Sequence, residues 1–298
     1  MSSNGHIPVL LKDVLEFLDV HREGVYIDCT LGLGGHSLEI LQTNPNAHVI
    51  GFDIDEKSLI LAKERLLPFA DRLSLYHSDY RYIPDLNIDF SEIKGILIDL
   101  GMSSFQLDSP ERGFSYHHDG PLDMRMDQRN NFTASKVINK YSEPKLAQVF
   151  RDYGELRQAK RLAHEIVSRR KRDKIETTHQ LLQVIEDVCR WHPQKGKSHP
   201  ASRVFQALRI EVNQELKNLS SFLERIILKS PKTARMLVIS FHSLEDRIVK
   251  QTFVRLAVQN DHPASIKILT KKPATASEEE INSNFRARSA KLRAAERI

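Results

Sequence analysis

The apolar positions in the first hundred residues follow two different periodicities. Four short apolar runs, beginning at Val25, His48, Leu73 and Gly95, predict β-strands because polar or glycine positions bound each of them. Between the runs, apolar residues recur at three- and four-residue intervals, which predicts helices. The run at 95–100 is continuously apolar, as a strand buried on both faces should be. Strands that alternate with helices predict a doubly wound parallel sheet.

The pattern then changes twice. Between residues 134 and 187 the periodicity is helical throughout, and no strand-like run occurs. Later positions return to the α/β pattern. Helices are predicted at 202–229 and 244–258, and strands at 236–241, 265–269 and 290–298. The polar stretch 271–284 is expected to be a mobile loop. The predicted organisation is an α/β core interrupted by an all-helical substrate-recognition domain. The expected boundaries are 1–107 and 205–298 for the core and 108–204 for the insertion.

A glycine cluster joins the first two predicted strands. The first strand runs into Gly32, Gly34 and Gly35, a helix follows, and the second strand ends on Asp53. Glycines let the backbone approach a ligand closely, and a helix start offers free N–H groups to an anion. A carboxylate at the end of the second strand, about 20 residues on, accepts hydrogen bonds from a ribose diol. The pattern predicts half of a nucleotide-type cofactor site.

The glycine spacing also distinguishes between cofactors. A dinucleotide site requires G-x-G-x-x-G, but here the sequence is G-x-G-G and Ser37 takes the last position. S-adenosylmethionine carries a carboxylate where a dinucleotide carries a pyrophosphate, so it needs less room. The spacing therefore favours S-adenosylmethionine over a nicotinamide cofactor.

Composition and charge limit the class of protein further. The chain has 298 residues and 40% hydrophobic residues, and it has no apolar run of the ~20 residues that cross a membrane. We therefore expect a cytoplasmic protein with no membrane partner.

Its two cysteines and its histidines lack metal-ligand spacing, so no metal site is expected. The net charge of +5 favours an anionic partner, and the run from Arg157 to Lys174 holds eight Lys/Arg against two acids.

Three further positions could carry chemistry. Asp99 ends the fourth predicted strand, where it could bind the cofactor, accept a hydrogen bond from a target amine, or only cap the next turn. The acid-rich stretch 119–127 is either functional or a solvated loop with a local ion pair. His242 follows a strand end, where it could contact substrate, whereas Ser243 and Asp246 resemble a helix capping box.

With these segments in hand, the chain resembles the bacterial 16S ribosomal RNA cytosine-N4 methyltransferases, which modify a decoding-centre cytidine of the small subunit. The matching stretches span nearly the whole chain and are His6–Leu10, Asp28–Ser37, Asp99–Gly101, Asp119–Asp127, His199–Arg203, Ser240–Arg247 and Arg288–Arg293. One departure is Phe105, where the family usually has proline in the loop after the fourth strand.

The resemblance implies a doubly wound, Rossmann-like class I methyltransferase core with an inserted helical domain, and 16S rRNA as partner. It places the S-adenosylmethionine contacts at Gly34, Gly35, His36, Asp53, Tyr80, Asp99 and Gln106. Asp123, Arg125, Arg203 and His242 are the expected substrate contacts. It leaves monomer and homodimer open, as well as naked rRNA or an assembled subunit as substrate.

The expected reaction is methyl transfer to the exocyclic N4 of a cytidine. This amine is a poor nucleophile, so the enzyme must align it with the methyl group and accept an N4 proton. Asp99 is the first candidate acceptor, and Asp123 or His242 is the second. The alternatives are a DNA amino-methyltransferase, a nicotinamide-dependent oxidoreductase and a non-catalytic RNA-binding module.

Overall fold

A computed structural model describes residues 7–192, 199–258 and 264–298. The chain forms two compact units, an α/β unit (Met1–Ser103 with Asn218–Ile298) and a helical unit (Ser104–Lys217). The boundaries expected from the sequence lay at 107/108 and 204/205. The second of these falls inside helix α9 (Pro200–Asn213), which packs against helices of the helical unit, so this helix stays whole in that unit.

The α/β unit is built on a seven-stranded sheet with the order β3-β2-β1-β4-β5-β7-β6. Its strands are β1 (Gly24–Asp28), β2 (Ala47–Asp53), β3 (Leu73–His77), β4 (Ile93–Asp99), β5 (Arg235–Ser240), β6 (Ile266–Ile268) and β7 (Lys291–Arg297). The pairs from β3 to β5 are parallel, and β7 is antiparallel to both β5 and β6. Every strand predicted from the sequence is present. The carboxyl ends of the five parallel strands meet at one edge of the sheet.

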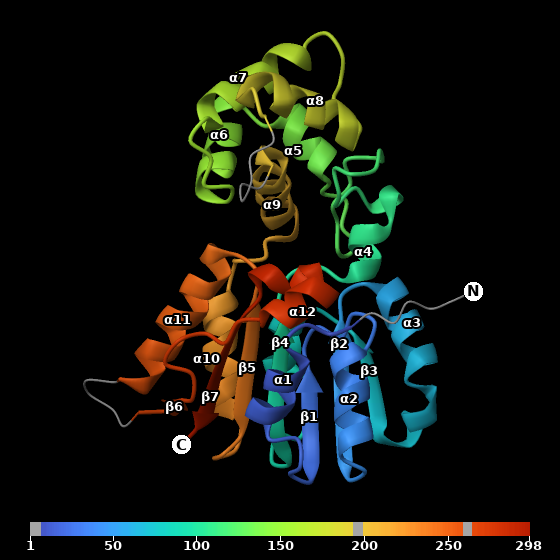
Figure 1. Ribbon diagram of the computed structural model, residues 1–298, viewed down its shortest axis with the longest axis vertical. Coiled ribbons are helices and arrows are strands. Elements are labelled where there is room, and N and C mark those ends of the chain that lie inside the picture. The colour runs from blue at the N-terminus through green and yellow to red at the C-terminus, as the bar shows by residue number, and fades with distance from the viewer. Residues whose placement is uncertain (1–6, 193–198, 259–263) are drawn as a thin grey trace. The chain divides into compact units, whose positions relative to one another are not determined.

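Helices cover both faces of this sheet, as the ribbon shows (Figure 1). The helices of the α/β unit are α1 (Leu11–Leu18), α2 (Gly35–Thr43), α3 (Glu56–Arg65), α10 (Leu219–Lys229), α11 (Ser243–Ala257) and α12 (Glu278–Ser283). Short 3-10 helices lie at η1 (Leu67–Arg72), η2 (Tyr80–Asp85) and η4 (Phe285–Ser289). The first three α-helices bury apolar residues in one core cluster, and α10 and α11 bury theirs in another. The result is a three-layer, doubly wound arrangement.

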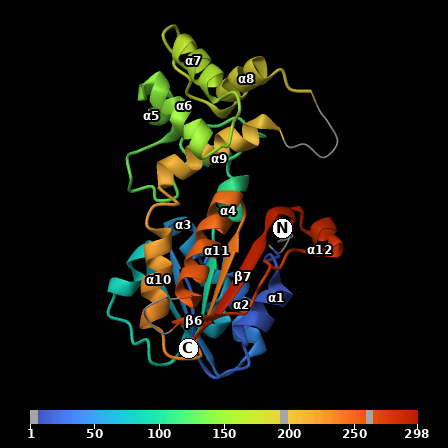
Figure 2. The ribbon, with the colours of Figure 1, turned by 90° about the vertical axis from the view of Figure 1, so that its left-hand side faces the viewer.

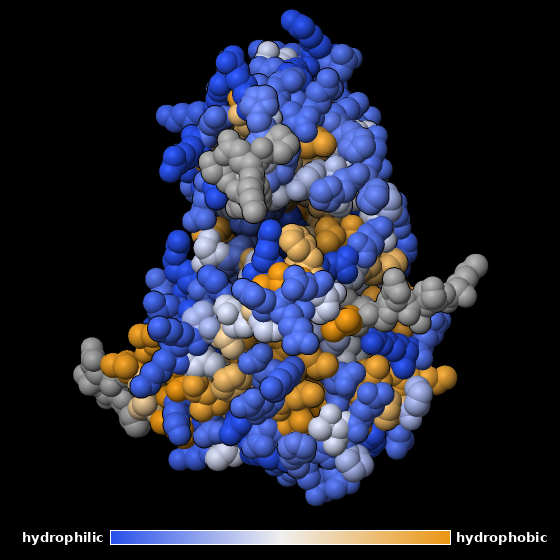
Figure 3. All heavy atoms as spheres, viewed as in Figure 1, coloured by the Kyte–Doolittle hydropathy of each residue, from blue (hydrophilic) through white to orange (hydrophobic). Residues whose placement is uncertain are grey.

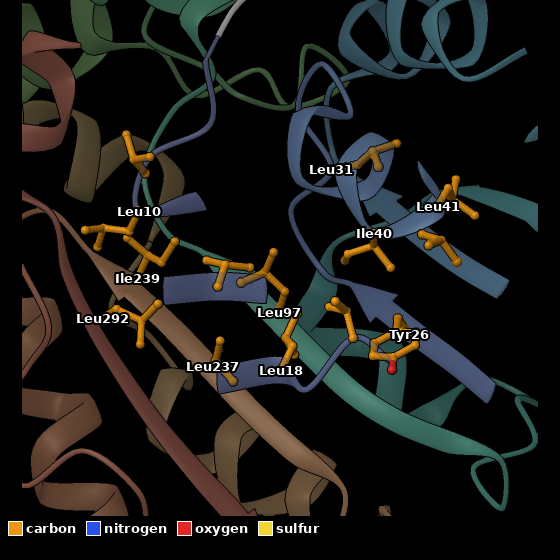
Figure 4. Close-up of a cluster of buried hydrophobic side chains, with 14 of the residues drawn as sticks. Leu10, Leu18, Tyr26, Leu31, Ile40, Leu41, Leu97, Leu237, Ile239 and Leu292 are labelled. Carbon is orange, nitrogen blue, oxygen red and sulfur yellow. The ribbon is translucent and has the colours of Figure 1, made fainter. Parts of the chain in front are cut away.

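Alternate side chains along the central strands belong to different core clusters. Leu97 points into the first cluster, while its neighbours Ile96 and Ile98 point into the second. Successive side chains of a strand face opposite sides of the sheet, so a continuously apolar strand feeds both cores. In the first cluster, Leu97 lies among Leu18 and Tyr26 (Figure 4). Each fully buried aliphatic side chain contributes roughly 1.5–3 kcal/mol.

The helical unit consists of α4 (Ser104–Asp108), η3 (Pro110–Arg112), α5 (Ala134–Lys140), α6 (Glu143–Asp152), α7 (Ala159–Arg169), α8 (Thr178–Cys189) and α9. Helix α9 packs against α5, α6 and α8, and both ribbon views show it among them (Figures 1 and 2). Thr177 caps α8 through a reciprocal capping box with Gln180. The face of this unit visible in Figure 3 is mostly hydrophilic.

Two predicted elements differ from the structure. The single helix expected at 202–229 is wrong, because the chain breaks into α9 and α10, with Gln214 and Asn218 in the left-handed region at φ of 50° and 62°. The loop expected at 271–284 contains helix α12, whose N-cap Ser277 accepts a hydrogen bond from the Glu280 backbone N–H at 3.2 Å. His6, at the start of the first matching stretch, lies outside the described residues.

Candidate active site

The glycine turn follows β1 at the carboxyl edge of the sheet. Gly32 and Gly34 have φ of +54° and +72°, a region that side chains with a Cβ rarely adopt. Gly34 is the N-cap of α2, and a Cβ there would lie 2.8 Å from Leu66 Cδ1. Gly35 is the first helical residue, and its Cα faces Pro8 of the N-terminal segment. The turn therefore needs glycine at two positions, and it leaves the start of α2 available to a ligand.

Asp53, at the end of β2, is tied directly to this turn. Its Oδ2 accepts a hydrogen bond from the Gly32 N–H at 2.7 Å, and its Oδ1 accepts one from the Asp55 N–H at 2.8 Å. Burial raises the pKa of Asp53 to about 6, although both hydrogen bonds favour the charged form. A carboxylate has about four acceptor positions, so two remain for ribose hydroxyls.

Asp99, at the end of β4, carries an acceptor atom without a partner. Its Oδ1 is buried and has no hydrogen-bond partner among the described residues, whereas its backbone N–H donates to Thr30 Oγ1 at 2.7 Å. Burial and the neighbouring carboxylates of Asp28 and Glu245 raise its pKa well above the usual value for aspartate. Buried polar atoms are nearly always paired, so this oxygen marks a place for an external donor.

His36 lies beside Asp99. Its Nε2 is 2.9 Å from the Val9 carbonyl oxygen, which can only accept, so Nε2 carries the proton. Its Nδ1 is 3.9 Å from Asp99 Oδ2. The imidazole is buried, and it connects the N-terminal segment to the carboxylate at the end of β4.

The other two cofactor candidates, Tyr80 and Gln106, belong to different units. Tyr80 opens η2 directly after β3, at the same edge of the sheet, and its ring packs edge-on against Phe222 at 4.8 Å between centroids. Gln106 lies in α4 of the helical unit, where its side chain is buried. Within the α/β unit the structure thus brings together the glycine turn, His36, Asp53 and Asp99.

The expected substrate contacts Asp123 and Arg125 bind each other. Arg125 donates from Nε and Nη2 to the two carboxylate oxygens of Asp123 at 2.8 and 2.6 Å, and from Nη1 to the Asn130 carbonyl oxygen at 2.6 Å. The ion pair considered for this stretch is therefore present. Arg203, on the first turn of α9, is exposed and donates to the Glu155 carbonyl oxygen at 3.3 Å.

His242 caps helix α11. Its Nδ1 accepts a hydrogen bond from the Glu245 N–H at 3.3 Å, and Glu245 Oε2 accepts one from the Phe241 N–H at 2.9 Å. The capping box expected from Ser243 and Asp246 is wrong by one position, because His242 and Glu245 form it. An imidazole nitrogen that offers a lone pair takes the role usually held by a serine or threonine oxygen.

The basic run 157–174 does not form a single free surface. Arg169 pairs with Glu165 and Asp187, each at 2.7 Å. Arg170 donates to the backbone carbonyl oxygens of Ile138 and Tyr141, so it holds the fold together. The other six cations of the run are exposed. Arg157 precedes α7, Lys160 and Arg161 lie in its first turn, and Lys171, Arg172 and Lys174 follow its end.

Sequence reasoning gave no role to Thr30 or Ser37. Thr30 fixes the backbone of Asp99, and Ser37 Oγ donates to Asp28 Oδ2 at 2.7 Å. Burial raises the pKa of Asp28 to about 6. Ser37 lies nine residues after Asp28, so a signal for that contact was available in the sequence, whereas Thr30 lies 69 residues before Asp99 and its contact left none.

The sheet order, with an antiparallel seventh strand between β5 and β6, and the glycine turn after β1 define a class I methyltransferase core. A family model described as the MraW methylase family matches residues 3–298. The chain belongs to this family. No described helix of the chain is both long and apolar enough to cross a bilayer.

Three relatives, each named ribosomal RNA small subunit methyltransferase H, match nearly end to end. The protein of Carboxydothermus hydrogenoformans is 46% identical over 98% of this chain and 98% of its own length. The protein of Symbiobacterium thermophilum is 45% identical over 97% of this chain and 95% of its own length. The protein of Halothermothrix orenii is 43% identical over 98% of this chain and 98% of its own length.

Proposed function

We propose that this chain transfers the methyl group of S-adenosylmethionine to the exocyclic N4 of a cytidine in 16S rRNA. The observation that carries this proposal is the Oδ1 of Asp99, which is buried without a hydrogen-bond partner among the residues that the structure describes, beside a glycine turn in a member of a methylase family. The small-subunit rRNA methyltransferases that match nearly the whole chain support RNA over duplex DNA as the substrate and methyl transfer over hydride transfer.

The residues of the α/β unit fit S-adenosylmethionine. Asp53 retains acceptor positions for a ribose diol, and the start of α2 at Gly34 and Gly35 can receive a carboxylate. His36, Tyr80 and Asp99 lie at the same edge of the sheet, and Gln106 remains an expected contact from the helical unit. When bound, the sulfonium supplies an electrophilic methyl group.

The chain's own task is to align the amine and to take its proton. As the N4–methyl bond forms, N4 loses one hydrogen as a proton, which restores its neutral charge. Asp99 is the favoured acceptor, since its Oδ1 has no competing donor among the described residues. Both other candidates are less suited: Arg125 occupies the oxygens of Asp123, and a backbone N–H occupies the lone pair of His242 Nδ1, which leaves Nε2 of the neutral ring as a donor. A carboxylate whose pKa is raised holds a proton more readily.

Charge favours the helical unit as the RNA-binding part. Residues 104–217 contain 21 Lys/Arg and 15 Asp/Glu, a net charge of +6, whereas the rest of the chain contains 23 and 24, a net charge of −1. The whole positive excess of the protein therefore resides in this unit. Neutralising phosphates with such cations supplies most sequence-independent affinity for RNA.

The test is transfer of labelled methyl groups to 16S rRNA that lacks the modification, followed by mass mapping of the product. We expect N4-methylcytidine at one position, and we expect Asp99→Asn to reduce the rate at least a hundredfold, a loss of roughly 3 kcal/mol of transition-state stabilisation. Calorimetry with S-adenosylhomocysteine separates a chemical defect from loss of binding. Label on another atom, or on duplex DNA in preference to rRNA, would overturn the proposal.

Two finer points belong to the same proposal. We infer that the substrate is rRNA within the small ribosomal subunit, and comparison of purified 16S rRNA with assembled subunits as methyl acceptors tests this. A homodimer is the second point, and light scattering at several protein concentrations distinguishes it from a monomer.

A further inference from the structure

An aromatic cluster lies at the start of α9 in the helical unit. The Tyr116 ring contacts two imidazoles, with centroid distances of 4.4 Å to His117 and 5.5 Å to His199. Trp191 meets His199 edge-on at 5.5 Å, and Phe205 meets Tyr116 edge-on at the same distance. We call these five residues the aromatic stack.

The inner side of the aromatic stack is firmly anchored. Phe205 is buried at 4% exposure, and the Tyr116 hydroxyl lies 2.9 Å from Ser202 Oγ. His199 is the N-cap of α9, and its Nδ1 accepts a hydrogen bond from the Ala201 N–H at 3.1 Å. The central rings are therefore held in fixed orientations.

The outer side reaches solvent. His117 is exposed, and Tyr116, Trp191 and His199 are half-buried. Packing between the helices does not require an exposed ring beside Tyr116. A flat ring held rigidly at a surface offers a π face to another flat, unsaturated ring.

Exposed arginines neighbour the members of the aromatic stack in the chain. Arg190 precedes Trp191 in the chain, Arg203 follows Ser202, and both guanidinium groups are exposed. Arg161, also exposed, lies close enough to Cys189 to oppose the rise in the pKa of that thiol caused by burial. One carboxylate also meets the stack, because Glu186 Oε1 lies 3.5 Å from His199 Nε2.

We propose that the aromatic stack binds an unpaired base of the RNA, with the exposed His117 as the stacking surface and the exposed Arg190 and Arg203 on the flanking phosphates. Only a base that is not paired within a helix can present its face to a protein ring. The net charge of +6 on this unit favours a polyanion over a protein partner. This inference rests on the proposed function, because it assigns one contact of the same RNA substrate.

The experiment measures binding of a fluorescein-labelled single-stranded RNA dodecamer and of a fully paired hairpin to the full-length protein. Stacking is worth ~1–3 kcal/mol per base, so His117→Ala should weaken dodecamer binding about five- to a hundredfold and leave hairpin binding unchanged. His117→Tyr should restore the affinity. The matched control is His118→Ala, because His118 is the adjacent exposed imidazole and lies outside the aromatic stack.

Trp191, the single tryptophan of the chain, provides a second readout. The dodecamer should change Trp191 emission in wild type with the same dissociation constant. Arg203→Gln should make the salt dependence of dodecamer binding shallower, whereas His117→Ala should leave the slope unchanged. Equal dodecamer affinity of wild type, His117→Ala and His118→Ala would overturn the inference.

Methyl transfer by wild type separates this inference from the proposed function. If wild type methylates 16S rRNA while all three proteins bind the dodecamer equally, the aromatic stack is not a base-binding surface and the proposed function stands. If binding depends on His117 but wild type methylates no rRNA, the proposed function fails and the base-binding surface stands.

Discussion

Replacing Gly34 with alanine tests the shape of the turn that the candidate active site depends on. Gly34 has φ of +72°, and a residue with a Cβ loses roughly 1–2 kcal/mol in that region. The new Cβ would also lie 2.8 Å from the Cδ1 of Leu66, whose side chain is fully buried, and such overpacking costs typically 1–3 kcal/mol. Because the end of the leucine side chain can yield partly, we expect a total loss of about 2–4 kcal/mol.

The adjacent glycine provides the control. Gly35 is helical, and its added Cβ would lie 3.2 Å from Pro8 Cγ, a tight but tolerable contact. Alanine is favoured over glycine in a helix by up to ~1 kcal/mol, which offsets that contact. Urea unfolding followed by circular dichroism should therefore show a large loss for Gly34→Ala and a change within about 1 kcal/mol for Gly35→Ala.

Calorimetry with S-adenosylhomocysteine completes the test. Gly34→Ala should bind more weakly at a temperature where both variants are folded, because the start of α2 is displaced. Equal stability losses in the two variants would show that the positive φ does not constrain this turn, and the reasoning would be refuted.

Three other predictions follow from single contacts. The pKa of Asp28 is about 6 in the folded protein, above its value in the unfolded chain, so the folded protein binds the Asp28 proton more tightly. The stability that Asp28 contributes therefore declines as pH rises from about 4 to 6. The difference in unfolding free energy between wild type and Asp28→Asn should decline over that range, and a difference independent of pH would contradict the assignment. Glu280→Ala should weaken S-adenosylhomocysteine binding several-fold in calorimetry, because Glu280 Oε1 accepts a hydrogen bond from the Leu10 N–H at 2.6 Å. Glu280→Gln keeps an acceptor oxygen and should retain the wild-type affinity. Equal affinities of Glu280→Ala and wild type would contradict a link between this hydrogen bond and the glycine turn. Arg170→Gln should lower the urea midpoint by the equivalent of ~1–3 kcal/mol, whereas Arg172→Gln, at an exposed position, should not; equal midpoints would contradict a structural role for Arg170.

Strands and the glycine turn could be predicted from the sequence because each leaves a local signal. Strand β4 is continuously apolar and ends on Asp99, and the turn requires glycine where φ is positive. The break at Gln214 and Asn218 leaves no such signal. Neither residue is a glycine or a proline, and apolar spacing continues through Leu216. Tertiary packing of α9 and α10 in separate units overrides that local pattern.

Side-chain pairing was also beyond the sequence. The sequence around Asp123 and Arg125 shows the charges but not that these two side chains form an ion pair. The basic run likewise does not show that Arg170 donates hydrogen bonds to backbone carbonyl oxygens. A charged residue in the sequence has many possible partners, and only the fold selects one. His242 illustrates the same limit, since an imidazole at a helix start can cap or catalyse with the same spacing.

The N-terminal segment explains why residues far from the glycine turn matter to it. Val9 accepts the hydrogen bond of His36, Leu10 donates to Glu280 on α12, and Asn284 donates to the Ile7 carbonyl oxygen at 2.9 Å. The polar segment that contains α12 is therefore ordered by its contact with the beginning of the chain, 270 residues away. Because His36 faces Asp99, any change that frees this segment alters the surroundings of the carboxylate assigned to the amine proton. The N-terminal segment and helix α12 thus act on the same side chain, so the site depends on a helix, α12, that lies in none of the matching stretches.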